Sequence, residues 1–133
     1  MELLTWEDWY NLGIEAFDAE HREIARLQNG LYDALQAGRP QTELRGLLSA
    51  VLAAMHAHCE REEQMLMEAG YAKLDLHKRQ HAAFFAQVDE YMAEVDAGYL
   101  MISIKLVRFL RDWLVNHIEI ADQVYAEEFK KKA

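Results

Sequence analysis

The stretch PQTELRGLLSAVLAAMHAHCEREEQMLMEAG, residues 40–70, repeats apolar side chains three and four positions apart along its whole length. That spacing places these side chains on one face of a single long α-helix. Pro40 suits the first turn of such a helix, and Gly70 suits the left-handed position just after its last turn. The stripe predicted to be buried comprises Leu44, Leu48, Val51, Met55, His58, Glu62 and Met65. A helix with one apolar face needs other elements to cover that face.

Three other stretches carry the same alternation and can supply that cover. One helix is expected from about Asp18, a good N-cap, to just before Gly38. Two more are expected over about 73–97 and about 100–128. Their stripes comprise Phe17, His21, Ile24, Gln28, Leu31 and Leu35, then Leu74, His77, His81, Phe84, Val88, Tyr91 and Val95, then Val107, Leu110, Leu114, His117, Ala121 and Val124. Because the connections are short, the sequence predicts an all-α protein, an up-down-up-down antiparallel four-helix bundle.

The N-terminal residues differ from the rest of the chain. Residues 1–17, MELLTWEDWYNLGIEAF, hold Trp6, Trp9, Tyr10 and Phe17 without a sustained helical period, so we expect an aromatic arm that packs on the bundle. A length of 133 residues fits one domain. The predicted division is a single domain over 1–133, with the arm at 1–17, the bundle at 18–128 and a solvated tail at 129–133.

Composition narrows the function classes. One proline and six glycines are too few for a many-stranded sandwich or barrel. A net charge of −9 argues against binding to nucleic acid or to an anionic membrane surface. No apolar stretch approaches the roughly 20 residues of a membrane span, and the first ten residues carry acids where a signal peptide carries bases. Cys59 is the single cysteine, so no internal disulfide forms and a cytoplasmic protein is expected.

Five of the six histidines and one glutamate lie on the predicted buried stripes: His21, His58, Glu62, His77, His81 and His117. Burying an unpaired polar group costs about 1–3 kcal/mol. Six such groups would overwhelm a net folding stability of about 5–15 kcal/mol unless something compensates them together. A bound metal provides that compensation.

The predicted topology brings these six side chains to one end of the bundle. His21, His77 and His81 lie early in their helices, whereas His58, Glu62 and His117 lie late in theirs, and the helices alternate in direction. Six ligands exceed the four that one zinc ion takes, so two neighbouring ions fit better. Imidazoles mixed with carboxylates suit iron, copper, nickel or zinc. A ferritin-like Glu-x-x-His pattern and a zincin HExxH are both absent from the sequence.

Four motifs together resemble the hemerythrin family, in its single-domain bacterial form, over nearly the whole chain. The arm and first helix place Trp6, Gly13 and His21 in the register of that family. The second helix reads HCEREE over 58–63, and the third reads HKRQH over 77–81. The fourth reads WLVNHIEIAD over 113–122. The resemblance implies a single hemerythrin-like domain.

The resemblance also implies a ligand set and a function. One iron would be held by His77, His81 and His117, and the other, with an open position, by His21 and His58. Glu62 and Asp122 would bridge the two irons beside an oxo or hydroxo bridge. The implied function is reversible dioxygen binding for storage, delivery or sensing, without catalysis. A di-iron oxidoreductase (an oxidase, a peroxidase or a nitric-oxide scavenger) and a structural or zinc-loaded bundle are the alternatives.

Spacing and resemblance disagree about Asp122. It follows His117 by five residues, about 140° round an ideal α-helix, so spacing alone predicts a surface acid. A local widening of the helix would bring it to the site.

The resemblance further marks residues around the ligands. It places Trp113, Leu114 and Ile118 in an oxygen pocket and lets Tyr125 hydrogen-bond a bridging carboxylate. Two residues depart from the family pattern. Cys59 replaces the family's usual phenylalanine, and Glu20, which replaces a glutamine, is expected to face solvent. Glu63 is left either at the surface or beside a ligand, and His56 falls outside the stripe, so we expect it to face solvent or the rim.

Overall fold

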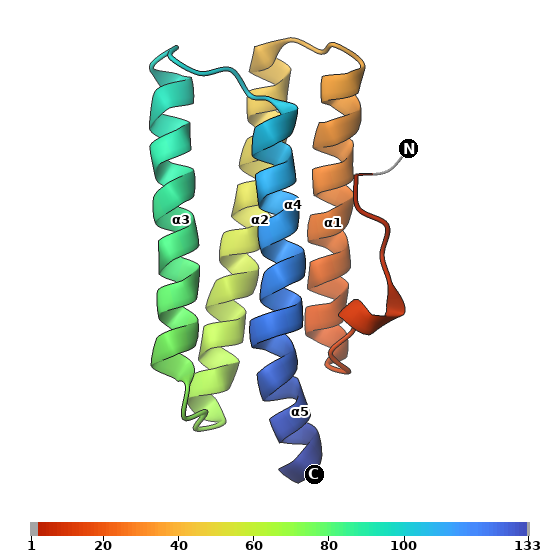
Figure 1. The fold of residues 1–133 in the computed structure, drawn as a ribbon, viewed down its shortest axis with the longest axis vertical. Coiled ribbons are helices and arrows are strands. Elements are labelled where there is room, and N and C mark those ends of the chain that lie inside the picture. The colour runs from red at the N-terminus through yellow and green to blue at the C-terminus, as the bar shows by residue number, and fades with distance from the viewer. Residues whose placement is uncertain (1–2, 133) are drawn as a thin grey trace.

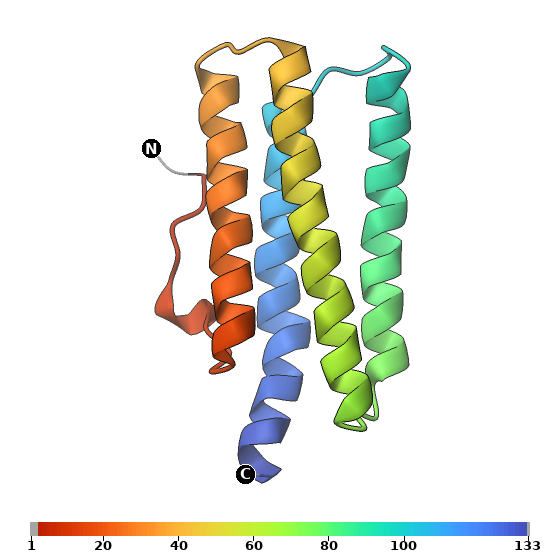
Figure 2. The ribbon, with the colours of Figure 1, turned by 180° about the vertical axis from the view of Figure 1, so that it is seen from behind.

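The computed structural model describes residues 3–132 and confirms the predicted four-helix bundle (Figures 1 and 2). The bundle helices are α1 (Glu15–Gln36), α2 (Gln41–Glu68), α3 (Leu74–Asp96) and α4 (Ile104–His117). Helix α4 continues through the π-helical segment η2 (Ile118–Asp122) into α5 (Gln123–Lys132). Neighbouring helices run antiparallel, so α1 and α3 begin at the end of the bundle where α2 and α4 finish. No strand occurs in residues 3–132, and no helix there is long and apolar enough to span a membrane.

Glycines end the helices where the sequence predicts. At Gly70 the backbone turns left-handed, with φ of +69°, after which the Tyr71 N–H donates to the Leu66 carbonyl at 3.0 Å. This closure satisfies a carbonyl of the last turn that has no partner within the helix. Gly38 and Gly98 adopt the same backbone region at the ends of α1 and α3.

The predicted start of the first helix was wrong by three residues. Helix α1 begins at Glu15, and Asp18 lies inside it. The Asp18 carboxylate is buried and accepts hydrogen bonds from the backbone N–H groups of Leu12, at 2.6 Å, and Gly13, at 3.1 Å. Asp18 therefore holds the preceding arm, which is shorter than predicted. The fourth helix also begins later than predicted, after Ser103, whose hydroxyl accepts from the Leu106 N–H.

The arm packs along α1, as expected. Its short 3₁₀ turn η1 (Asp8–Tyr10) brings Tyr10 into the core, where it contacts the rings of Trp6 and Trp9 edge to face. Nearer the N-terminus, the backbone N–H of Leu4 donates to the Asn29 side-chain oxygen on α1, and the Asn29 amide nitrogen donates to the Leu4 carbonyl, both at 2.8 Å. These contacts cover the face of α1 that no other bundle helix reaches (Figure 1).

The fourth predicted helix is interrupted in a way that the sequence pattern does not indicate. The Gln123 N–H donates to the Ile118 carbonyl, five residues back instead of four, so η2 contains one extra residue in its turn. Beyond this turn the buried face shifts by one position. Val124, predicted to be buried, is 45% exposed, whereas Tyr125 is fully buried. The residues predicted as a tail are helical, because α5 continues to Lys132; Phe129 packs against the core, Lys130 and Lys131 are exposed, and residue 133 lies outside the described residues.

Candidate metal centre

Seven buried or nearly buried side chains from all four bundle helices meet at the end where α1 and α3 begin. They are His21 on α1, His58 and Glu62 on α2, His77 and His81 on α3, His117 on α4 and Asp122 on η2. Two groups have all their ligand atoms within 4.8 Å of one another. One comprises Glu62, His77, His81 and His117, and the other comprises His21, His58, Glu62 and Asp122. Every predicted metal ligand belongs to one of these groups.

The inner imidazole nitrogens lie close together in two sets, one on each side of the centre. Nε2 of His21 lies 2.8 Å from Nε2 of His58. Nε2 of His117 lies 3.0 Å from that of His81 and 3.2 Å from that of His77. These nitrogens all face inward, and each would offer a lone pair to a common point once it has lost any proton it carries. This donor geometry suits metal ions.

Glu62 and Asp122 each contact histidines of both groups. Glu62 hydrogen-bonds His77 and lies 3.2 Å from His81 Nε2 and 3.3 Å from His58 Nε2. Asp122 lies 3.2 Å from Nε2 of His77 and of His117, and 3.5 Å from that of His21. The two carboxylates therefore lie between the groups, where a ligand shared by two ions must lie.

The carboxylate of Asp122 is buried without the hydrogen bonds that it could accept. Both carboxylate oxygens are buried, and within the part of the chain that the structure describes they have imidazole nitrogens 3.2–3.5 Å away but no well-aligned hydrogen bond; Nδ1 of His21 has no hydrogen-bond partner there either. A buried ionised carboxylate without a partner is costly. A cation between Asp122 and the histidines would remove that cost, so the residues fit a metal.

The π-helical turn explains how Asp122 reaches the site despite its unfavourable spacing. In an α-helix, a residue five positions after His117 would lie about 140° away. The extra residue in η2 is absorbed by the wider turn, so Asp122 faces the same way as His117. The spacing argument alone, which predicted a surface acid, was wrong, and the resemblance supplied the only signal for this residue.

Deleting Glu119, an exposed residue of η2, is expected to leave His117 and Asp122 facing together. The deletion places Asp122 four residues after His117, about 40° round a regular α-helix, and preserves the register of Tyr125. Thermal melting and zinc uptake should both remain close to those of the unaltered chain. Deleting the exposed Asp112 on α4 is the control, because it rotates His117 by about 100° relative to the first part of that helix. Equal damage by the two deletions would contradict this account of the turn.

The buried cluster shifts several pKa values in the metal-free protein. Burial alone would lower the pKa of His77 and His117, but hydrogen bonds and charges from Asp122 and Glu62 raise both to about 9. Burial together with the neighbouring His58 lowers the pKa of His21 to about 4. Although burial opposes ionisation of Glu62, its hydrogen bonds to the surrounding histidines hold its pKa well below the ordinary value. At neutral pH the carboxylate is ionised, His77 and His117 are protonated and His21 is neutral.

Metal uptake by the metal-free protein is therefore expected to release protons. His77 and His117 must each lose a proton before they bind a metal, so loading at pH 7 should release at least two protons per chain. The apparent affinity should rise with pH up to about pH 9, and His21, with a pKa of about 4, contributes to this rise only in the acidic range. Isothermal titration in buffers of different ionisation enthalpy counts these protons. A count near zero would contradict the predicted protonation states.

Three further groups contact the ligands from outside. The Tyr125 hydroxyl donates to Oε2 of Glu62 at 3.0 Å. Glu63, whose place the sequence left open, lies beside a ligand, with its Oε2 2.8 Å from Nδ1 of His81. Glu20 was wrongly expected to face solvent, since its Oε1 lies 2.6 Å from Nδ1 of His58. Whether Glu20 reaches His58 depends on how α1 and α2 are aligned along their axes, and the sequence pattern does not determine that alignment.

The residues expected to form an oxygen pocket lie around His117. Trp113 stacks on the His117 ring, with centroids 4.5 Å apart, and on Phe84, at 4.0 Å. Leu114, three residues before His117, and Ile118, the residue after it, are buried. Together they form an apolar wall next to the candidate ligands.

The remaining residues singled out from α2 lie on different faces. Cys59 is buried, and its pKa is raised by burial and then by the charges of nearby acids, so its thiol stays protonated. His56 is exposed and stacks on Phe85, with ring centroids 3.6 Å apart, away from the cluster. The expectation that His56 faces solvent or the rim is confirmed.

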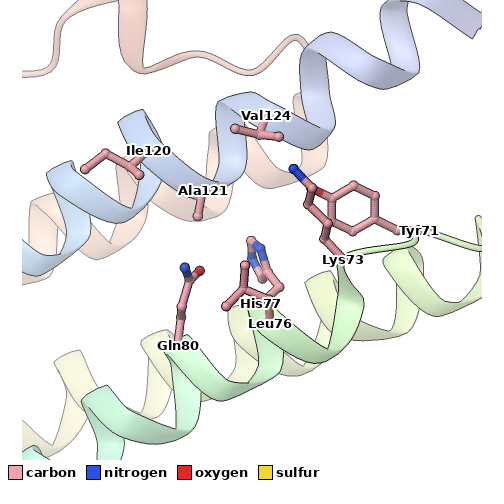
Figure 3. A pocket seen from close by; sticks show the side chains of 8 residues that line it. All are labelled: Tyr71, Lys73, Leu76, His77, Gln80, Ile120, Ala121 and Val124. Atoms are coloured by element: carbon pink, nitrogen blue, oxygen red, sulfur yellow. The ribbon is translucent and has the colours of Figure 1, made fainter.

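A hollow of about 180 Å³ opens beside His77, between the start of α3 and the segment from η2 to α5 (Figure 3). Its lining residues are Tyr71, Lys73, Leu76, His77, Gln80, Ile120, Ala121 and Val124. The exposed side chains of Leu76, Ile120 and Val124 make its rim largely apolar. The hollow reaches the side chain of His77, which is itself buried.

Comparison with known proteins gives consistent matches. A family model described as the hemerythrin HHE cation binding domain matches residues 12–129. A bacteriohemerythrin from Stenotrophomonas maltophilia strain R551-3 is 37% identical over 130 residues, which are 98% of this chain and 84% of that protein. A bacteriohemerythrin from Pseudomonas aeruginosa strain LESB58 is 32% identical over 127 residues, which are 96% of this chain and 82% of that protein. A solved structure of wild-type hemerythrin has a TM-score of 0.88 at 28% identity and covers 94% of this chain and 96% of that one.

Proposed function

Because the chain belongs to the hemerythrin family, we propose that it binds dioxygen reversibly at a non-haem di-iron site, for oxygen storage, delivery or sensing. The observation that carries the proposal is the pair of buried donor groups that share Glu62, with Asp122 placed between them. A single ion would leave one group of inward-facing imidazoles without a partner. Two ions would give the imidazoles of both groups a metal to bind.

In the proposed assignment, His77, His81 and His117 hold one iron, and His21 and His58 hold the other. Glu62 and Asp122 would be shared by the two. When bound, two ferrous ions supply the two electrons that dioxygen binding takes up. The two carboxylates cancel half of the four positive charges of such a pair, which lowers the cost of keeping it in a buried site.

The chain's other residues hold the ligands in place and keep water out. Tyr125, fully buried, donates its hydrogen bond to one oxygen of Glu62 and so fixes the orientation of that carboxylate. Trp113 packs flat on His117, which restricts rotation of the imidazole. Leu114 and Ile118 are buried and carry no proton donors, so they would help to keep water out of the oxygen pocket assigned to them and Trp113.

A di-iron oxidoreductase is the second candidate, and the hollow beside His77 is the observation that favours it. A catalyst needs a path for a second substrate, and the hollow supplies one from solvent. The path ends at an imidazole edge on the proposed iron that already has three histidines, not at the one with two. We therefore propose a binding protein and not an enzyme. The single buried cysteine fits a reducing compartment, and we place the protein in the cytoplasm.

Repeated oxygenation of the iron-loaded protein tests the proposal. The protein is reduced anaerobically, exposed to oxygen and deoxygenated through several cycles, while absorbance and iron content are followed. The proposal expects two irons per chain and a spectrum that returns in each cycle. A stoichiometry near one metal, or uptake of zinc alone, would contradict the di-iron site. Continuous oxygen consumption with an added reductant would support the oxidoreductase instead.

A further inference from the structure

His58 is the candidate ligand whose outer nitrogen is held most closely by a carboxylate. Its Nε2 faces His21 and Glu62, and its Nδ1 lies 2.6 Å from Oε1 of Glu20. The other oxygen of Glu20 accepts a hydrogen bond from the Arg61 guanidinium. Arg61, Glu20 and His58 thus form a continuous chain from the surface to the centre, which we call the outer relay.

We propose that Glu20 is a positioning residue that sets the affinity and reduction potential of the metal held by His21 and His58, and that Arg61 moderates it. The inference rests on the proposed function for the identity of the metal. It does not depend on that function for the effect of Glu20 on His58 as a ligand.

The first part of the argument concerns orientation. A carboxylate accepts only, so the Nδ1 of His58 must carry the proton in that hydrogen bond, and the Nε2 lone pair is left facing the centre. Carboxylates behind metal-bound histidines fix the tautomer and raise the basicity of the ring. Loss of such a partner typically weakens metal binding about 10–100-fold.

The second part concerns charge. Glu20 places a negative charge 2.6 Å from Nδ1 of His58, and its side chain is only 21% exposed, so solvent screens that charge incompletely. A negative charge stabilises the more highly charged, oxidised metal and lowers the reduction potential. Arg61 neutralises part of that charge, but its side chain is 56% exposed and its effect is smaller. Glu20 and Arg61 therefore act in opposite directions on the same ligand.

The other half of the centre supplies a matched comparison. His81 donates from Nδ1 to Glu63 at 2.8 Å, and the Glu63 side chain is 26% exposed, close to the value for Glu20. Within residues 3–132, no arginine forms an ion pair with Glu63. The centre thus has one carboxylate behind a histidine on each side, and only the Glu20 side is moderated by an arginine.

Four variants test the outer relay: Glu20→Gln, Arg61→Met, the two combined, and Glu63→Gln. Glutamine keeps the size of the side chain and an oxygen that accepts from His58, so the fold is retained while the charge is lost. Zinc affinity is measured by competition with a chromophoric chelator, and the reduction potential of the iron-loaded protein by spectroelectrochemical titration. The resonance of the His58 Nδ1 proton in the zinc-loaded protein reports which half is affected.

Glu20→Gln is expected to weaken one zinc site about 10-fold, to raise the potential and to move the His58 proton resonance. Arg61→Met is expected to strengthen the same site and lower the potential, and to have no effect once Glu20 is glutamine. Glu63→Gln should leave the His58 resonance unchanged. Shifts of equal sign in Glu20→Gln and Arg61→Met, or no shift in either, would overturn the inference. A chain that binds zinc but never two irons would refute the proposed function, while the zinc series would still decide the role of Glu20.

Discussion

Replacing His58 by alanine is expected to abolish reversible oxygenation, whereas replacing His56, two residues earlier, is expected to leave it intact. The two side chains point about 200° apart on α2. His58 is buried with Nε2 2.8 Å from that of His21, and it is one of only two histidines assigned to the iron that binds oxygen. His58→Ala removes one of those two imidazoles and takes away the histidine partner of Glu20, which keeps its hydrogen bond from Arg61.

His56→Ala is the matched control on the same helix. His56 is exposed and its ring contact is with Phe85, so we expect a change of only about 0.5 kcal/mol in the free energy of unfolding. Iron content, oxygenated-form spectra and thermal melting of both variants decide the outcome. Loss of iron in His56→Ala with retention in His58→Ala would show that the proposed ligand set is wrong on α2.

The parts of the fold that depend on local patterns were predictable from the sequence. Helix ends at glycines follow from a backbone conformation that other residues avoid, and at Gly70 the structure has this conformation. Most of the buried stripe of α2 was also predictable, from Leu44 to Glu62, because a regular helix preserves its period. Its last predicted member, Met65, is only partly buried, and Leu66 is buried instead.

The parts of the fold that depend on contacts between distant segments, or on an irregular turn, were not predictable from the sequence. Asp18 looks like a helix cap, but its carboxylate serves the arm, and only the folded path of Leu12 and Gly13 reveals that. The η2 turn leaves no mark in a periodic pattern except its effect on Val124, which a regular helix would bury. The periodic pattern predicted that histidines meet at one end of the bundle, whereas only the family resemblance indicated that Asp122 joins them.

Replacing Glu62 by glutamine is expected to cause the largest loss of metal of any single conservative change. Glu62 is fully buried, contacts histidines of both groups and belongs to both sets of donor atoms. Without its charge, two divalent ions would be offset by Asp122 alone. Removing one partner from a buried ionic cluster costs about 3–5 kcal/mol, which corresponds to a loss of roughly two to four orders of magnitude in affinity.

We therefore expect Glu62→Gln to retain at most one ion and to lose reversible oxygenation. The same change should reduce the protons released on metal uptake, because Glu62 helps to raise the pKa of His77 and His117 to about 9. Glu60→Gln, an exposed position on the same helix, removes an equal charge without touching the cluster and should behave like the unaltered chain. Metal analysis and proton counts on the two variants separate a charge needed inside the cluster from a general effect of net charge. If Glu62→Gln still bound two ions with undiminished affinity, the carboxylate could not be shared between them, and the two donor groups would have to act as independent sites.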